Sequence, residues 1–159
     1  MATVYSDQQT LKRALEAGTG YSLANGLNTT NGKVVTAVAT YTSTAAAAGT
    51  VIELFTLPKN ARVLRGVMIT GALGASVTFA IGTDVSLKDD AGTATTAAGA
   101  ANLLAATDVS AASNTNFCAT RLLGAGALTS AATTFNITTA GATMTASIPV
   151  IVWVEYLQN

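Results

Sequence analysis

Large apolar side chains recur at every second position in the clearest segments of this sequence. Between residues 75 and 83, Val77, Phe79 and Ile81 alternate with small or hydroxyl-bearing residues. Successive side chains of a β-strand point to opposite faces of the sheet, so a period of two predicts a strand with one buried face. The same period recurs near the end of the sequence, and it indicates a protein built from β-sheet.

The other expected strands are rich in β-branched and aromatic residues and are separated by turn-forming residues. With the first segment they span residues 34–42, 50–57, 62–70, 75–83, 116–123, 133–139 and 143–157. About 7 or 8 short strands separated by turns are typical of an all-β sandwich or jelly roll. Residues 84–102 consist mainly of Ala, Thr, Gly and Asp, and we expect a surface loop there.

Two strands carry candidate interface residues. In the last strand, the face that holds Val150 and Val152 and the face that holds Ile151 and Trp153 are both apolar, so this strand is either central or covered by a partner. In strand 62–70, we expect Val63, Arg65, Val67 and Ile69 to share one face. Arg62 and Arg65 are expected on the same side, either at a wet sheet edge or reaching carboxylates of a partner. For Trp153, a place in the core is the preferred interpretation over a ligand platform.

Residues 1–32 differ from the rest and form an expected N-terminal arm, which leaves 33–159 as the sandwich. Ser6 and Gln9 have the spacing of a capping box, which allows a short helix over 7–16 before Gly and Asn residues interrupt any periodicity. The arm is either a floppy tail or a segment that becomes ordered on a partner. Its candidate contact residues are Tyr5, Leu11, Tyr21 and Leu23.

Composition excludes several function classes. Charged residues make up 10% of the chain, against about 25% in ordinary soluble domains, and eight basic residues balance eight acidic ones. A neutral chain lacks the basic surface of a nucleic-acid-binding protein. With no His and one Cys, a zinc site and His-based catalysis are not expected. We therefore expect no enzyme activity, no metal and no cofactor.

Two further features, one acidic and one sulfur-bearing, are candidate sites. Asp84, Asp89 and Asp90 could bind Ca²⁺, but their spacing does not fit an EF-hand, and a solvated loop is the preferred interpretation. Cys118 is expected to be a free, buried thiol. The longest strongly apolar run has ten residues, too few for a membrane-spanning helix. No secretory signal is apparent, so we expect synthesis in a cytoplasm and no membrane partner.

Several stretches together resemble a family of small virion structural proteins of tailed bacteriophages. The resemblance rests on Met1–Gln8, Val51–Gly66, Gly74–Thr83, Leu103–Asp108 and the C-terminal strand that ends in Glu155 and Tyr156. It implies a β-rich, often trimeric head decoration or cement protein whose partner is the major capsid protein. The motifs are strand and turn patterns, so the resemblance assigns no role to individual residues.

These observations support one leading hypothesis. A folded chain of this size exposes roughly 7,000 Å², and its sparse charge is unusual for a protein that must stay monomeric. We therefore expect a capsid decoration protein on the surface of the virion, made in the host cytoplasm, trimeric, and bound to the assembled shell. The alternative is a head-fibre or tail-associated module that binds a receptor or glycan through exposed Tyr and Trp side chains.

Overall fold

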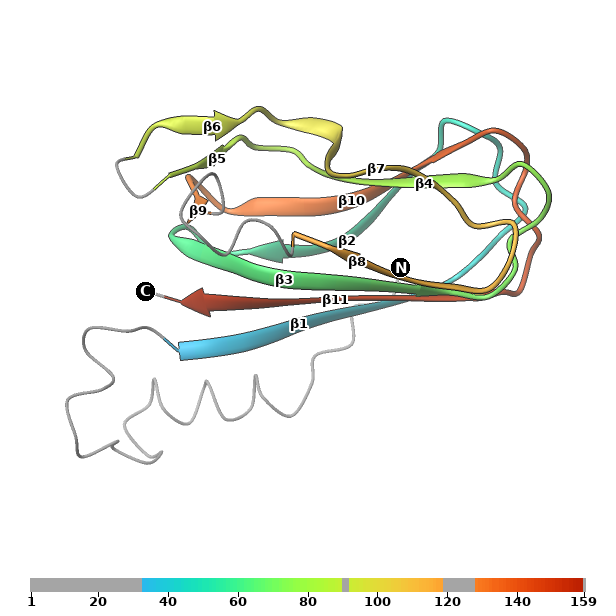
Figure 1. Cartoon of the computed structure of the whole chain (residues 1–159), viewed down its shortest axis with the longest axis horizontal. Helices are drawn as coiled ribbons and strands as arrows, with labels where there is room; N and C mark the ends of the chain where they lie inside the picture. The colour runs from blue at the N-terminus through green and yellow to red at the C-terminus, as the bar shows by residue number, and fades with distance from the viewer. Residues whose placement is uncertain (1–32, 90–91, 119–127, 159) are drawn as a thin grey trace.

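The computed structural model describes residues 33–89, 92–118 and 128–158, and the regular structure in these ranges is entirely β-strand. Figure 1 shows two layers of strands that run along the long axis of the molecule. The predicted all-β sandwich is thus confirmed. The predicted arm and its helix over 7–16 lie outside the described residues.

The larger sheet has seven strands and the smaller has four, and every pairing is antiparallel. The larger sheet contains β1 (Lys33–Thr42), β11 (Pro149–Gln158), β3 (Ala61–Thr70), β8 (Ser113–Phe117), β9 (Leu128–Thr129), β5 (Leu87–Lys88) and β6 (Ala94–Thr96). The smaller sheet contains, in order, β2 (Val51–Leu57), β10 (Thr133–Ala140), β4 (Thr78–Thr83) and β7 (Gly99–Asp108).

Eight of these strands pair in a nested order, from the ends of the chain inward. The first, β1, pairs with the last, β11; β2 pairs with β10, β3 with β8, and β4 with β7. A long antiparallel hairpin acquires this nesting when it rolls up into two sheets, which is the jelly-roll arrangement. The three very short strands β5, β6 and β9 extend one end of the larger sheet.

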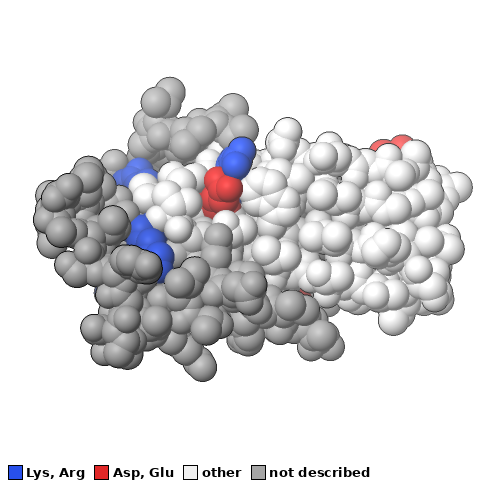
Figure 2. All heavy atoms as spheres, turned by 90° about the horizontal axis from the view of Figure 1, so that it is seen from below, with Lys and Arg blue, Asp and Glu red and all other residues white. Residues whose placement is uncertain are grey.

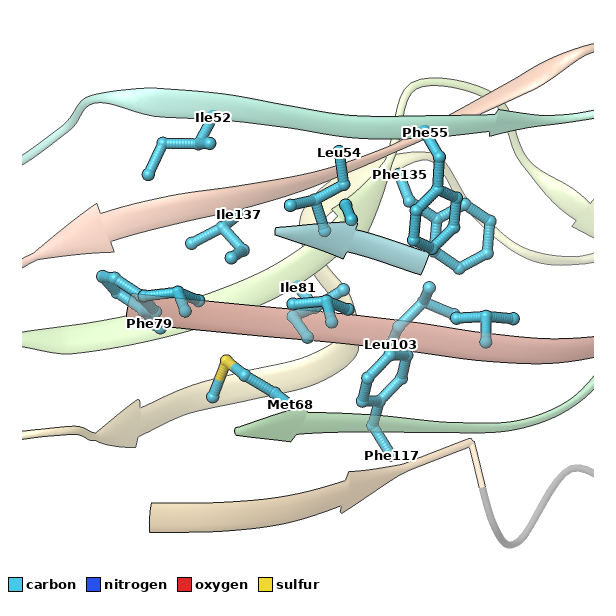
Figure 3. Close-up of a cluster of buried hydrophobic side chains, with 14 of the residues drawn as sticks. Ile52, Leu54, Phe55, Met68, Phe79, Ile81, Leu103, Phe117, Phe135 and Ile137 are labelled. Carbon is cyan, nitrogen blue, oxygen red and sulfur yellow. The ribbon is translucent and has the colours of Figure 1, made fainter. Parts of the chain in front are cut away.

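The core lies between the sheets and follows the predicted alternation. Phe79 and Ile81 of β4 are fully buried, and so are Val152 and Val154 of β11. Side chains from both sheets interdigitate in this layer, as Figure 3 shows for ten labelled residues. In the smaller sheet the rings of Phe55 and Phe135 stack with centroids 5.2 Å apart. Aromatic pairs at this spacing stabilise a core beyond the area that they bury.

The prediction of a loop over 84–102 is wrong, because this segment holds β5, β6 and the start of β7. Ladder hydrogen bonds come from the backbone, so a strand needs no large side chains when its neighbour supplies the packing. Gly82 allows the close approach of β7, since a Cβ there would overlap the carbonyl oxygen of Gly99. The Asn102 side chain then binds the backbone N–H of Thr83 at 3.0 Å and its hydroxyl at 2.7 Å.

The starts of two strands also differ clearly from the predictions. The strand β8 begins at Ser113 rather than at residue 116, and the rest of its predicted span, beyond Cys118, lies outside the described residues. The last strand begins at Pro149 rather than 143 because residues 141–148 form a tight turn. In this turn, Thr145 donates a backbone hydrogen bond to the carbonyl of Leu73, which joins two neighbouring turns.

The predicted face of β3 is wrong for Val63, which is in the core and 1% exposed. Tyr156 lies opposite Val63 and Glu155 lies opposite Arg65, so Leu64 is an extra residue in β3. A β-bulge of this kind reverses the side-chain alternation beyond it. Arg65, Val67 and Ile69 therefore point away from the core, whereas Val63 points into it.

The turn at Gly141 gives a test of the packing at one end of the sandwich. Gly141 has φ +83°, and a Cβ there would overlap the carbonyl oxygen of Ser76. We expect Gly141→Ala to lower the free energy of unfolding by about 3 kcal/mol, through left-handed strain plus overpacking. Gly49→Ala is the matched control, because Gly49 has φ +85° and open space around it. It should lose only about 1 kcal/mol, from the strain alone. Equal losses in urea unfolding would contradict the packing at Gly141.

Candidate functional site

The outward-pointing side chains of β1, β11 and β3 form the surface that we call the outer face. The register brings Val38, Trp153 and Val67 into one row across the three strands, and Thr40, Ile151 and Ile69 into the next. The residues of the outer face are Val34, Thr36, Val38, Thr40, Ile151, Trp153, Glu155, Leu157, Arg62, Arg65, Val67 and Ile69. Strand β11 lies at the centre of this face because β1 and β3 flank it.

The outer face is unusually apolar for a surface. Val34 is 55% exposed and Ile69 40% exposed, while Ile151 and Trp153 are half-buried. Seen from this side of the molecule, the charged side chains gather on one half, and most of the other half carries none (Figure 2). The charged pair Glu155 and Arg65 lies between Val34 and Trp153, so the apolar part of this face is formed by the two rows around Trp153 and Ile151. Apolar surface of this kind is typical of interaction sites.

The opposite sheet shows that this apolar character is not simply a product of composition. Its outward positions hold mainly small or polar residues, among them Thr56, Thr134, Asn136 and Ala80, with Val51 at the rim. The hydroxyls of Thr56 and Thr134 lie 3.2 Å apart and hydrogen-bond to each other. This second surface suits contact with water, so the two broad surfaces of the sandwich have different chemistry.

A charged pair lies within the outer face. Arg65 donates two hydrogen bonds to the Glu155 carboxylate, at 2.7 Å and 2.9 Å, across the β3–β11 register. The Arg65 guanidinium also lies over the Trp153 ring, 5.3 Å from its centroid. The bonds to Arg65 lower the pKa of Glu155, and the same bonds raise the pKa of Arg65. Arg and Trp are the residue types most enriched at the energetic centres of interfaces.

The two arginines lie on the same face because of the bulge in β3. They are three positions apart, which on a regular strand would place them on opposite sides. The extra residue Leu64 brings Arg62 opposite Leu157 and Arg65 opposite Glu155, and these two partners lie two apart on β11. The carboxylate that binds Arg65 therefore comes from its own chain.

The structure brings together only some of the predicted interface residues. Ile151, Trp153, Arg62 and Arg65 meet on the outer face, whereas Tyr5, Leu11, Tyr21 and Leu23 lie outside the described residues. Val34, Val38 and Ile69 belong to the same face, and the sequence analysis missed them. The signal for β1 was present, because Val34 and Val38 alternate with Val35, Ala37 and Ala39 and make both faces of that strand apolar.

Asp84 and Asp89 serve local structure, and Asp90 lies outside the described residues. The Asp84 carboxylate accepts the backbone N–H of Thr134 at 2.7 Å, and the Asp89 carboxylate accepts that of Thr93 at 2.8 Å. Over the described ranges, no three His, Cys, Asp or Glu side chains are grouped so that they could hold a metal. Cys118 is buried. The described part of the chain also holds no helix able to cross a membrane.

Searches of solved structures find the same fold in phage capsids. A chain in the capsid of Ralstonia phage GP4 has a TM-score of 0.59 and 21% identity, over 82% of this chain and 88% of that one. A chain of the cyanophage Pam1 capsid asymmetric unit has a TM-score of 0.58 and 18% identity, over 100% of both chains. A chain of the Helicobacter pylori bacteriophage KHP30 capsid gives 0.55 and 15% identity, over 80% and 90%. At these identities the likeness is one of fold. Protein-family models and curated proteins gave no match.

The ion pair between Arg65 and Glu155 predicts that the pKa of the Glu155 carboxyl depends on the Arg65 side chain. A carboxyl with a lowered folded-state pKa adds stability above its unfolded pKa, and this contribution is lost as the pH falls through the folded pKa. In Arg65→Gln we expect the pKa of Glu155, measured by NMR titration, to rise from its lowered value toward or above the usual carboxyl value. Arg62→Gln is the control and should leave it unchanged, because Arg62 lies opposite Leu157. An unchanged Glu155 pKa in Arg65→Gln would refute the pair.

Proposed function

We propose that this chain is a capsid decoration, or cement, protein of a bacteriophage, bound to the outer surface of the assembled shell. The main support is the extent of the likeness to capsid chains. Each of the three matches covers at least 80% of this chain and at least 88% of the capsid chain. The matched capsid components are therefore separate chains of about this size rather than domains of much larger shell proteins.

The chemistry of the surface supports an assembled state. The whole chain carries only eight basic and eight acidic residues, which is little charge to oppose association. The outer face adds an apolar patch that includes an Arg–Trp pair, and such pairs are typical of interface centres. A structural role also fits the acidic groups, since Asp84, Asp89 and Glu155 all bind groups of their own chain.

In the proposed mechanism, three copies assemble through the strand that holds Ile151 and Trp153. Residues 1–32 of each copy lie across neighbouring subunits of the major capsid protein, and Tyr5, Leu11, Tyr21 and Leu23 supply apolar contacts there. Linking three weak contacts raises the overall avidity without new chemistry. A protein that binds the assembled shell and not its separated subunits stabilises the shell by mass action, by about 2.7 kcal/mol per site at 100 times its Kd.

The alternative function, a receptor- or glycan-binding module, receives less support. It needs an exposed aromatic platform, because sugars stack on Tyr and Trp rings. Within the described ranges no aromatic side chain is fully exposed: Tyr156 is buried, while Tyr41 and Trp153 are half-buried. The Arg65 guanidinium already occupies one side of the Trp153 ring.

Quantitative binding to capsids tests the proposed function. Added to purified capsids that lack it, the full chain should saturate at a fixed high copy number and raise the temperature at which the capsids release DNA. A chain without residues 1–32 should lose most of this binding, at least about 100-fold, because the linked contacts are gone. The control is Thr56→Asp, which adds a charge to the smaller sheet's outward surface and should bind normally. Only a few copies per virion, or normal binding without residues 1–32, would reject the proposal.

A further inference from the structure

One corner of the outer face, at the start of β1, is strongly exposed. The chain that precedes β1 reaches the sandwich at this corner. Val34, the most exposed apolar residue of the outer face, is the second residue of β1, directly after Lys33. Residues 1–32 therefore leave the sandwich at the edge of the outer face. Any segment that covers this face from the same chain has to begin at this corner.

The length and composition of the segment also fit. Thirty-two residues can extend to about 100 Å, whereas the ten residues of β1 span only about 33 Å. The segment carries apolar side chains, among them Leu23 and Leu27, close to its junction with β1. A tethered segment acts at an effective concentration of about millimolar, so its own chain is favoured over a second molecule.

We propose that in the free chain residues 1–32 fold back and cover the outer face, with Leu23 and Leu27 packed near Val34 and Trp153. The covered face keeps the free protein monomeric despite its sparse charge. This inference concerns the chain before it meets any shell, so it stands or falls separately from the proposed function.

The only tryptophan of the chain, Trp153, lies in the middle of the outer face and reports on its cover. We expect the full-length variant Leu23→Asp/Leu27→Asp to show red-shifted Trp153 emission and about twofold or greater quenching by acrylamide, because buried carboxylates destabilise docking. The matched control Asn25→Asp/Asn28→Asp adds the same charge to the same segment at polar positions and should match the wild type. Emission unchanged in the leucine variant would overturn the proposal.

A reciprocal experiment changes the face and monitors the segment. Ile69→Asp places a charge on the exposed part of the outer face, and we expect trypsin to cleave after Lys12 and Arg13 of the full chain about fivefold faster or more, because docked segments resist proteolysis. Thr56→Asp, an exposed strand position of the other sheet, should leave the rate unchanged. Equal cleavage rates in all three proteins would exclude docking on this face.

Dilution identifies which chain supplies the cover. Trp153 emission of the wild type should stay constant from about 50 μM to 0.5 μM, because docking within one chain does not depend on concentration. Emission that shifts to the red on dilution would overturn the same-chain assignment. The occupant would then be the segment, or the outer face, of a second copy.

Discussion

The ladder between β1 and β11 is the contact on which the rest of the fold depends. It places Lys33 opposite Gln158, the two ends of the described sandwich, and the other pairs of the jelly roll nest inside it. Contacts so distant in sequence cost loop entropy, which grows only slowly with loop length. Strand β11 also pairs with β3, so it is hydrogen-bonded on both sides. Its inward side chains supply the core, and its outward side chains form the centre of the outer face.

One inserted residue in β3 links the fold to the candidate interface. Without the bulge at Leu64, the alternation of β3 would place Arg62 and Arg65 on opposite sides of the sheet. With it, Val63 completes the core, while Arg65 reaches both Glu155 and the Trp153 ring. The charged pair is satisfied within the chain, so a partner that covers this face meets a neutral, pre-ordered surface. Pre-ordering lowers the entropic cost of binding.

The sequence predicted the parts of the fold in which large apolar residues alternate. Phe79, Ile81 and the β11 residues took their predicted places because burial of such side chains decides strand register. Residues 84–102 could not be predicted, since their Ala, Thr and Gly side chains carry no period, and Gly82 and Asn102 fix β7 through contacts distant in sequence. The face of Val63 was wrong because a bulge leaves no local signal. The interface was half predicted. Ile151 and Trp153 were recognised because both faces of their strand are apolar, whereas Ile69 was expected on one face with Val63 and Arg65 and was not recognised as an interface residue.

The outward surfaces of the two sheets differ in polarity, although both are built from a small set of residue types. The outward side of β10 presents Thr134 and Asn136, whose polar side chains suit contact with water, while the hydroxyl of Thr138 on the same side is buried without a hydrogen-bond partner among the described residues. The outer face exposes Val34 and Ile69 beside the half-buried Ile151 and Trp153, and covering such apolar surface is favourable. Two coverings are consistent with this chain: its own residues 1–32 before assembly, and neighbouring subunits afterwards. Both coverings use the same apolar area, so each excludes the other on that area. The affinity of the outer face for neighbouring subunits must then exceed the free-energy cost of displacing residues 1–32. This requirement restricts association to sites where several contacts form at once.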